Sequence, residues 1–202
     1  MTLATTAFAG GFSNPVYDSQ SIFHALMTGF ARPGTVADVT IGIAQPEPMQ
    51  TAQGAVALCL ADHDTPVYLS EGLKSGSVAQ WIAFHAGASV TDLPHDARFA
   101  FCASGDHLPD FADFAIGSQE FPDRSTTLVI EVTELAGGPM FALTGPGIKA
   151  ETIMSPQGLP DDFLEQWALN RALFPRGVDV VLTSGRQMLC LPRTTRLGKK
   201  EL

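Results

Sequence analysis

The chain has 202 residues, of which 45% are hydrophobic and only 16% are charged, so the composition predicts a folded domain with a substantial core and excludes a disordered chain. Its formal net charge is −9, and because such a charge repels phosphate backbones, nucleic acid is excluded as the main partner. No apolar run approaches the roughly 20 residues that span a bilayer, and the N-terminus lacks the pattern of a signal peptide, so we expect a cytoplasmic protein without membrane contact.

The first half of the chain predicts alternating helices and strands. Apolar residues recur at three- and four-residue steps after Pro15 and predict an amphipathic helix of about 15 residues. Arg32-Pro33-Gly34 ends it, because the residue before a proline avoids the helical region. The other elements expected here are a weak strand at 36–44, helices at 51–61 and from 78 to Gly87, strands at 67–69 and 98–103, and one or two helical turns at 108–114.

The second half contains more strand and turn signals. Residues 126–132 and 140–143 flank a glycine-rich turn and predict a β-hairpin. After them we expect a tight loop at 145–148, a strand ending at Met154, a helix opening at Pro160, a strand at 178–182, a Ser184-Gly185 turn and a final strand at 188–191. The sequence thus predicts a single α/β domain over residues 1–202, with a mixed β-sheet flanked by helices and flexible ends at 1–11 and 197–202.

No residue pattern predicts a metal site or a catalytic constellation. The three cysteines, Cys59, Cys102 and Cys190, lie in separate apolar runs, and their odd number and long spacing favour buried reduced thiols over disulfides or zinc ligands. The five histidines are scattered, without a partner at ligand spacing. Ser104 and His107 lie in a loop without the framework of a nucleophile elbow. We therefore assign no catalytic residue and no metal.

Positive charge is concentrated in residues 170–202, which we call the basic island. It holds seven basic against two acidic side chains, a net +5, whereas residues 1–169 carry a net −14. Arg171 and Arg176 bracket the end of the predicted helix, where they either complement the helix dipole or bind an anion. Arg193 and Arg196 suit docking on an acidic partner. Gly145-Pro146-Gly147 is either a tight turn or an anion-binding loop.

Several motifs resemble the PhnH family of the bacterial carbon–phosphorus lyase system. They occur in order along nearly the whole chain, and His24 stands where many members are expected to have an arginine. The matching segments are Gly11-Phe12-x-Asn14-Pro15-Val16, Gln20-x-x-Phe23, Ala31-Arg32-Pro33-Gly34, Thr144-Gly145-Pro146-Gly147-Ile148, Asn170-Arg171-x-x-Phe174-Pro175-Arg176-Gly177-Val178-Asp179 and Leu191-Pro192-Arg193-Thr194-Thr195.

The resemblance implies a homodimer that assembles with the G, I and J subunits, with K and L as further candidates. It implies a non-catalytic subunit required to form α-D-ribose 1-methylphosphonate 5-triphosphate from ATP and methylphosphonate. The implied fold is similar to the large domain of type I pyridoxal-phosphate transferases without the cofactor. We expect no cofactor, because the four lysines lie in the tail or in polar, turn-like segments, and a Schiff base requires a buried one.

The motif residues form one set of candidates for anion binding or for a subunit interface. The alternative function is a stand-alone enzyme that binds a phosphate or nucleotide in an arginine- and glycine-lined pocket. The candidate residues are Arg32, Gly145, Gly147, Asn170, Arg171, Arg176, Asp179 and Arg193.

Overall fold

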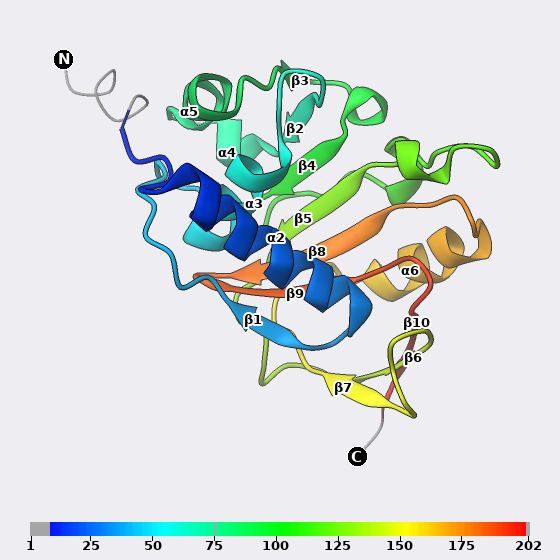
Figure 1. Cartoon of the computed structure of the whole chain (residues 1–202). Coiled ribbons are helices and arrows are strands. Elements are labelled where there is room, and N and C mark those ends of the chain that lie inside the picture. The colour runs from blue at the N-terminus through cyan, green and yellow to red at the C-terminus, as the bar shows by residue number, and fades with distance from the viewer. Residues whose placement is uncertain (1–8, 75, 201–202) are drawn as a thin grey trace.

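A seven-stranded sheet runs through the centre of the molecule (Figure 1). The computed structural model describes residues 9–74 and 76–200. The strand order is β1-β9-β8-β5-β4-β2-β3, in which neighbouring strands from β3 to β8 are parallel and β9 is antiparallel to both β8 and β1. The strands are β1 (Val36–Asp38), β2 (Val67–Leu69), β3 (Val90–Thr91), β4 (Phe99–Cys102), β5 (Thr127–Glu131), β8 (Asp179–Ser184) and β9 (Gln187–Leu191).

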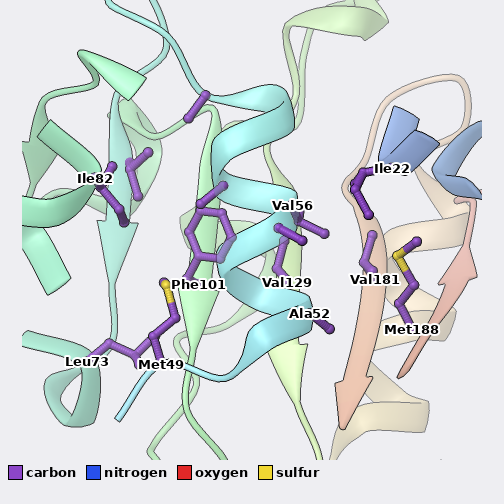
Figure 2. Packing of buried hydrophobic residues seen from close by; sticks show 14 of the residues in the cluster. Ile22, Met49, Ala52, Val56, Leu73, Ile82, Phe101, Val129, Val181 and Met188 are labelled. Atoms are coloured by element: carbon purple, nitrogen blue, oxygen red, sulfur yellow. The ribbon is translucent and has the colours of Figure 1, made fainter. Parts of the chain in front are cut away.

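Helices cover both faces of this sheet, and each face has its own apolar core. On one face, α2, α3 and α5 pack over Phe101, Val129 and Val181 (Figure 2). On the other face, α6 and a short 3-10 helix pack over neighbouring strand residues such as Leu128 and Val180. The helices are α2 (Pro15–Ala31), α3 (Thr51–Leu60), α4 (Glu71–Lys74), α5 (Val78–Ala86) and α6 (Phe163–Ala172), with 3-10 turns at Pro94–Asp96, Phe111–Asp113 and Pro122–Arg124.

A small antiparallel sheet lies against the α6 side of the molecule. Its order is β10-β6-β7, formed by β6 (Phe141–Thr144), β7 (Thr152–Met154) and β10 (Arg196–Lys199). Phe141, Leu143 and Met154 contribute to the same core cluster as α6. The small sheet therefore extends the covering layer on that face, and β10 brings the basic island back beside α6.

The structure confirms most of the predicted elements. The helices α2, α3, α5 and α6 and the strands β2, β4, β8 and β9 all lie where the sequence predicts them. The weak strand at 36–44 is only three residues long, and α4 and β3 were not predicted. Cys102 and Cys190 are buried as predicted, whereas Cys59 is only partly buried, and none of the three is in a disulfide.

The predicted hairpin between 126–132 and 140–143 is wrong. β5 lies between β4 and β8 in the large sheet, while β6 is the central strand of the small one. Leu128, Val129 and Ile130 are consecutively buried, which is typical of a parallel strand covered on both faces. β6 alternates between buried and partly buried residues. The glycine-rich segment after β5 therefore leads the chain from one sheet to the other.

Both ends of the described chain have backbone or side-chain hydrogen bonds to other segments. Residues 197–199 form β10 and pair with β6. At the other end, the carbonyl of Gly10 accepts a hydrogen bond from Ala44 N (2.9 Å), and that of Ala9 accepts one from Trp81 Nε1 (3.2 Å). Residues 1–8 and 201–202 lie outside the described part of the chain. The described segments at both ends are held by hydrogen bonds.

Candidate functional site

Asn170 joins the end of α6 to the start of β8. Its side chain is buried and bonds both backbone groups of one residue: Nδ2 donates to Val178 O (2.9 Å) and Oδ1 accepts from Val178 N (2.7 Å). Gly177 has a φ of 121°, and a Cβ there would lie 2.6 Å from Asn170 Oδ1. Only glycine fits this approach. The Asn170…Gly177-Val178 part of the motif therefore fixes the end of α6 to the start of β8.

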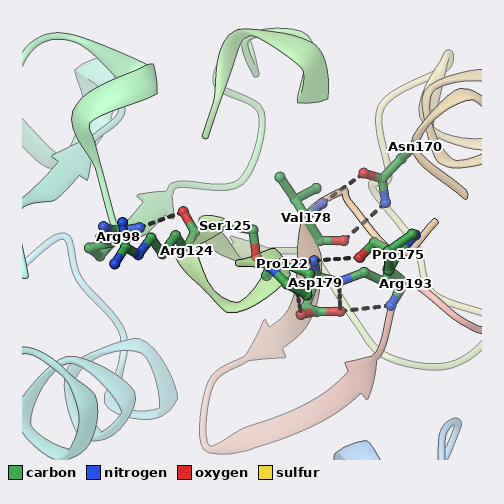
Figure 3. A network of polar contacts seen from close by, with 9 residues as sticks. All are labelled: Arg98, Pro122, Arg124, Ser125, Asn170, Pro175, Val178, Asp179 and Arg193. Carbon is green, nitrogen blue, oxygen red and sulfur yellow. Dashed lines mark hydrogen bonds and ion pairs between the residues drawn. The ribbon is translucent and has the colours of Figure 1, made fainter. Parts of the chain in front are cut away.

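Arg193 is a second structural element of the motif (Figure 3). β8 and β9 pair so that Val180 opposes Leu191, which places Asp179 and Arg193 at the same end of the hairpin. Arg193 Nε and Nη2 bind the two carboxylate oxygens of Asp179 at 3.1 and 2.5 Å, and its backbone N–H binds Asp179 Oδ1 at 2.7 Å. The side chains are only 12% and 23% exposed.

The remaining donors of Arg193 also have protein partners. Nη1 donates to the carbonyls of Pro122 (2.9 Å) and Pro175 (3.3 Å), and Nη2 donates to Ser125 Oγ (2.6 Å). A guanidinium has five N–H donors, and these contacts together with Asp179 occupy all five. Arg193 therefore holds three chain segments together.

A cavity of about 430 Å³ opens between α6, β10 and the loop that follows β6. We call it the arginine cavity. It brings together Gly145, Arg171 and Arg193 from the predicted set. Its complete lining is Gly145, Pro146, Arg171, Phe174, Arg193, Thr194 and Arg196. The sequence predicted three of these as site residues and named Arg196 as a docking residue. Phe174, Pro146 and Thr194 lie in the family motifs but are not among the predicted binding residues.

Two glycines shape the loop beside this cavity. Gly145 has a φ of 137°, and a Cβ there would lie 3.1 Å from Thr194 O. Gly147 has a φ of 81°, and a Cβ there would lie 2.1 Å from Ala31 O at the end of α2. Both residues combine a backbone conformation that favours glycine with a close approach to another chain segment. The loop is thus fixed between the end of α2 and the segment after β9.

The other predicted residues do not line the cavity. Arg32 is exposed just after α2, near the loop but outside the lining. Arg176 is half-buried in the turn after α6 and is also absent from the lining. Gly147, Asn170 and Asp179 act on neighbouring backbone or on Arg193, as described above. The cavity therefore brings together three of the eight predicted residues, Gly145, Arg171 and Arg193.

A larger cavity of about 570 Å³ lies against α6 and has the opposite charge character. Asp110, Asp162 and Glu165 line it together with apolar residues such as Leu169, which is 65% exposed. No sequence motif predicts these residues as functional. The spacing of Asp162, Glu165 and Leu169 could have shown that they share one face of the helix.

A row of polar groups lies at the carboxyl ends of the parallel strands, where α/β folds often bind ligands. Asp106 Oδ2 accepts hydrogen bonds from Ser70 Oγ (2.5 Å) and Gly72 N (2.7 Å), and Glu131 Oε1 accepts one from Gln50 Nε2 (2.6 Å). Burial, and then the charge of Asp106, raise the pKa of Glu131. These bonds tie the end of β2 to the loop after β4 and the end of β5 to the start of α3, so the row has a structural role.

The lysines do not fit a pyridoxal-phosphate site. Lys74 Nζ lies 2.8 Å from Glu71 and 3.0 Å from Asp92, and these bonds raise the pKa of Lys74, the opposite of what an imine-forming amine requires. Lys149 and Lys199 are exposed, and Lys200 forms an ion pair with Glu151.

Among the described residues no group of three histidine, cysteine or carboxylate side chains could hold a metal ion. No helix in residues 9–74 and 76–200 is long and apolar enough to cross a membrane.

Comparison with known proteins identifies the family. The family model described as "Bacterial phosphonate metabolism protein (PhnH)" matches residues 10–198. A protein of Rhizobium meliloti (strain 1021), named α-D-ribose 1-methylphosphonate 5-triphosphate synthase subunit PhnH, is 52% identical over 200 residues, covering 99% of this chain and 100% of that protein. The putative C-P lyase subunit protein HtxG of Stutzerimonas stutzeri is 31% identical over 182 residues, covering 90% of this chain and 86% of that protein. The chain therefore belongs to the PhnH family.

Proposed function

We propose that this chain is a subunit of the complex that forms α-D-ribose 1-methylphosphonate 5-triphosphate from ATP and methylphosphonate. The observation that carries the proposal is the 52% identity to a named subunit of that synthase over essentially the full length of both chains. We further infer that it assembles with the G, I and J subunits of the carbon–phosphorus lyase system, with K and L as further candidates. Three cysteines outside any disulfide, two of them buried, suit work in the reducing cytoplasm.

We infer that the chain supports the reaction without carrying it out alone. Asn170, Asp179 and Arg193, which are prominent in the closing motifs, are occupied by contacts within the chain. A residue whose donors are all bound internally has none left for a substrate. The motif is thus better explained by the need to hold this fold in a shape that partner subunits recognise.

We also infer that two copies associate through the outer face of α2. Phe23 and Met27 are 52% and 55% exposed there, and Val16 and Tyr17 are exposed near its start. Asp18 is the only charged side chain among the 17 residues of the helix. In a chain with a net charge of −9, a face without charge repels a second copy least, and apolar, aromatic and methionine side chains are typical of homodimer interfaces.

Reconstitution tests the subunit role. The isolated chain is expected to give no turnover of ATP with methylphosphonate, and the other subunits are expected to regain activity when it is added. Size-exclusion chromatography of the co-expressed subunits should recover the chain in a complex. Turnover by the isolated chain would favour the stand-alone enzyme, while full activity of the other subunits without it would contradict the proposal.

We infer, finally, that the fold is related to the large domain of type I pyridoxal-phosphate transferases. Its support is a mostly parallel seven-stranded sheet with helices on both faces. Superposition of the sheet on that of such a transferase tests the inference, and a different strand order would contradict it.

A further inference from the structure

The arginine cavity carries positive charge that the chain does not neutralise. Its lining contains three arginines and no carboxylate, in a chain with 21 acidic and 12 basic side chains. The carboxylates that line the neighbouring cavity, Asp110, Asp162 and Glu165, are absent from it. Because the charge of Arg193 is balanced by Asp179, the uncompensated charge comes from Arg171 and Arg196.

Arg171 carries a buried donor without a partner. Its Nε is shielded from solvent and has no hydrogen-bond partner in the described part of the chain. No hydrogen bond or ion pair among the described residues engages the guanidinium of Arg196. A buried N–H without an acceptor is costly and rare in native proteins. Among the described residues, neither guanidinium is therefore held by a hydrogen bond or an ion pair.

The backbones that carry Arg171 and Arg196 are fixed by secondary structure. Trp167 Nε1 donates to Thr195 O (2.9 Å), which fastens α6 to the segment before β10. Arg171 follows Trp167 by four residues and so lies on the same helix face. Arg196 pairs with Thr144 in the β10–β6 ladder, directly before Gly145. The cations therefore approach the cavity from two fixed elements, a helix and a strand.

The size and the walls of the cavity indicate a ligand larger than an inorganic ion. Its volume of about 430 Å³ is more than ten times the roughly 30 Å³ that a water molecule occupies in the liquid. Phe174, whose side chain is 60% exposed, and Pro146 provide apolar surface beside the cations. A planar or apolar group can pack there while an anionic group reaches the arginines.

We propose that the arginine cavity binds an organic phosphate or phosphonate, with its tetrahedral anionic group between Arg171 and Arg196 and its organic part against Phe174 and Pro146. Guanidinium groups match the geometry of such oxygens and pair with them bidentately. A concave site of this size favours a small anion over an acidic protein surface, which would instead meet the arginines on an open face. The site stands on the geometry of the cavity and not on the proposed subunit function.

Calorimetric titration of the purified full-length chain at low ionic strength tests the site. The probes are inorganic phosphate, methylphosphonate, ATP and an acidic peptide. We expect the Kd for the phosphorus-containing ligands to rise roughly tenfold or more in Arg171→Gln and in Arg196→Gln. Arg186→Gln is the matched control, because Arg186 lies at the far end of the β8–β9 hairpin and bonds Ile41 O instead. It should leave the Kd unchanged.

Phe174→Ala separates the two sources of the anionic group. If the ligand is a nucleotide, this variant weakens ATP binding and leaves inorganic phosphate unaffected. If it is a small phosphonate, methylphosphonate binds at least as tightly as ATP. Should Arg171→Gln fail to fold, Arg196→Gln alone decides the matter, since Arg196 is exposed on an edge strand.

Three results would overturn the proposal: no binding of any phosphorus-containing probe at millimolar concentration, equal losses in the Arg186→Gln control, or binding of the acidic peptide alone. Measuring the activity of the complex reconstituted with the same variants distinguishes loss of ligand binding from loss of the subunit function. A variant can lose the ligand and still assemble.

Discussion

The arginines of the basic island differ in how many of their donors are occupied within the chain. Arg193 uses all five side-chain donors on a carboxylate, a hydroxyl and two carbonyls. Arg171 and Arg196 have no such bonds among the described residues and face a cavity. The same residue type is thus a structural brace at one position and a free cation at two others.

Replacement of Arg193 by Ala should destabilise the fold strongly. It leaves Asp179 and the two carbonyls without their donors in a half-buried site, and we expect the free energy of unfolding to fall by about 2–4 kcal/mol. Urea unfolding followed by circular dichroism measures this. Arg196→Ala is the control, since an exposed arginine without partners should change the free energy by at most about 0.5 kcal/mol. Equal effects of the two changes would contradict the assignment of Arg193.

The buried thiols make stability dependent on alkaline pH. Burial raises the pKa of Cys102 and of Cys190 to about 12, whereas thiols of the unfolded chain ionise near pH 8.5–9. The stabilisation by the neutral thiols is complete below that pH and is lost as pH rises toward 12. We expect a fall in the free energy of unfolding on the order of 1–2 kcal/mol per thiol at pH 10.

A Cys102→Ala, Cys190→Ala double variant isolates the thiol contribution. Tyr68, whose pKa is also raised by burial, is present in both the variant and the parent chain and so cancels in the comparison. The slope of stability against pH above 9 should therefore be smaller in the variant than in the parent chain. Identical slopes would show that the thiols do not contribute.

At the scale of elements, the sequence predicts those segments whose burial follows a simple period. α2 shows the period of an amphipathic helix, and β8 is a short run of β-branched and leucine residues. No strand is predicted at β10, in which Leu197 is the only large apolar residue. Its strand conformation comes from backbone pairing with β6, which leaves no trace in composition. The pairing partner of β5 was missed for the same reason.

At the candidate site, too, the sequence predicts which residues take part but not which tertiary contacts they make. Motifs and charge selected Arg171, Arg193 and Gly145, and the structure brings these together. Whether each arginine is free or occupied depends on which backbone carbonyls approach it, and those of Pro122 and Pro175 come from distant segments. Such contacts are set by tertiary structure, so the sequence could not distinguish a brace from a binding residue.

Removal of β10 should loosen the small sheet. A chain ending at Thr195 loses the pairing partner of β6 and the packing of Leu197 on the second core cluster, which we expect to cost about 2 kcal/mol. Hydrogen exchange should show lost protection of the amides of residues 141–144. A chain ending at Lys200 is the control and should retain that protection. Equal protection in both chains would mean that β10 contributes little.

At the scale of the whole molecule, charge and exposed apolar surface are unevenly distributed. The basic island carries a net +5 and the preceding 169 residues a net −14. α2 crosses one face of the large sheet, and α6 covers the other (Figure 1). An uncharged apolar helix on one side and charged cavities on the other would allow self-association and ligand binding to use separate surfaces.

Phe23→Asp should convert a dimer into a monomer, because it places a carboxylate at the centre of the uncharged face of α2 in both copies. Light scattering coupled to size-exclusion chromatography gives the mass, and the dissociation constant should rise at least about thirtyfold. Leu169→Asp is the matched control, a change at an apolar residue of α6 that is at least as exposed as Phe23. Loss of the dimer in the control alone would place the interface on α6.

The pairing of β1 with β9 has a consequence for how the chain folds. Val36 opposes Leu189, and a Cβ at Gly29 of α2 would lie 2.7 Å from Cys190 Sγ, so segments separated by about 150 residues of sequence meet at one edge of the sheet. Contacts of such sequence separation slow folding, because the chain entropy of closing a long loop is lost before the contact forms. α2 therefore cannot complete its packing until β9 is in place, and the first and last thirds of the chain should become protected from exchange in the same kinetic step.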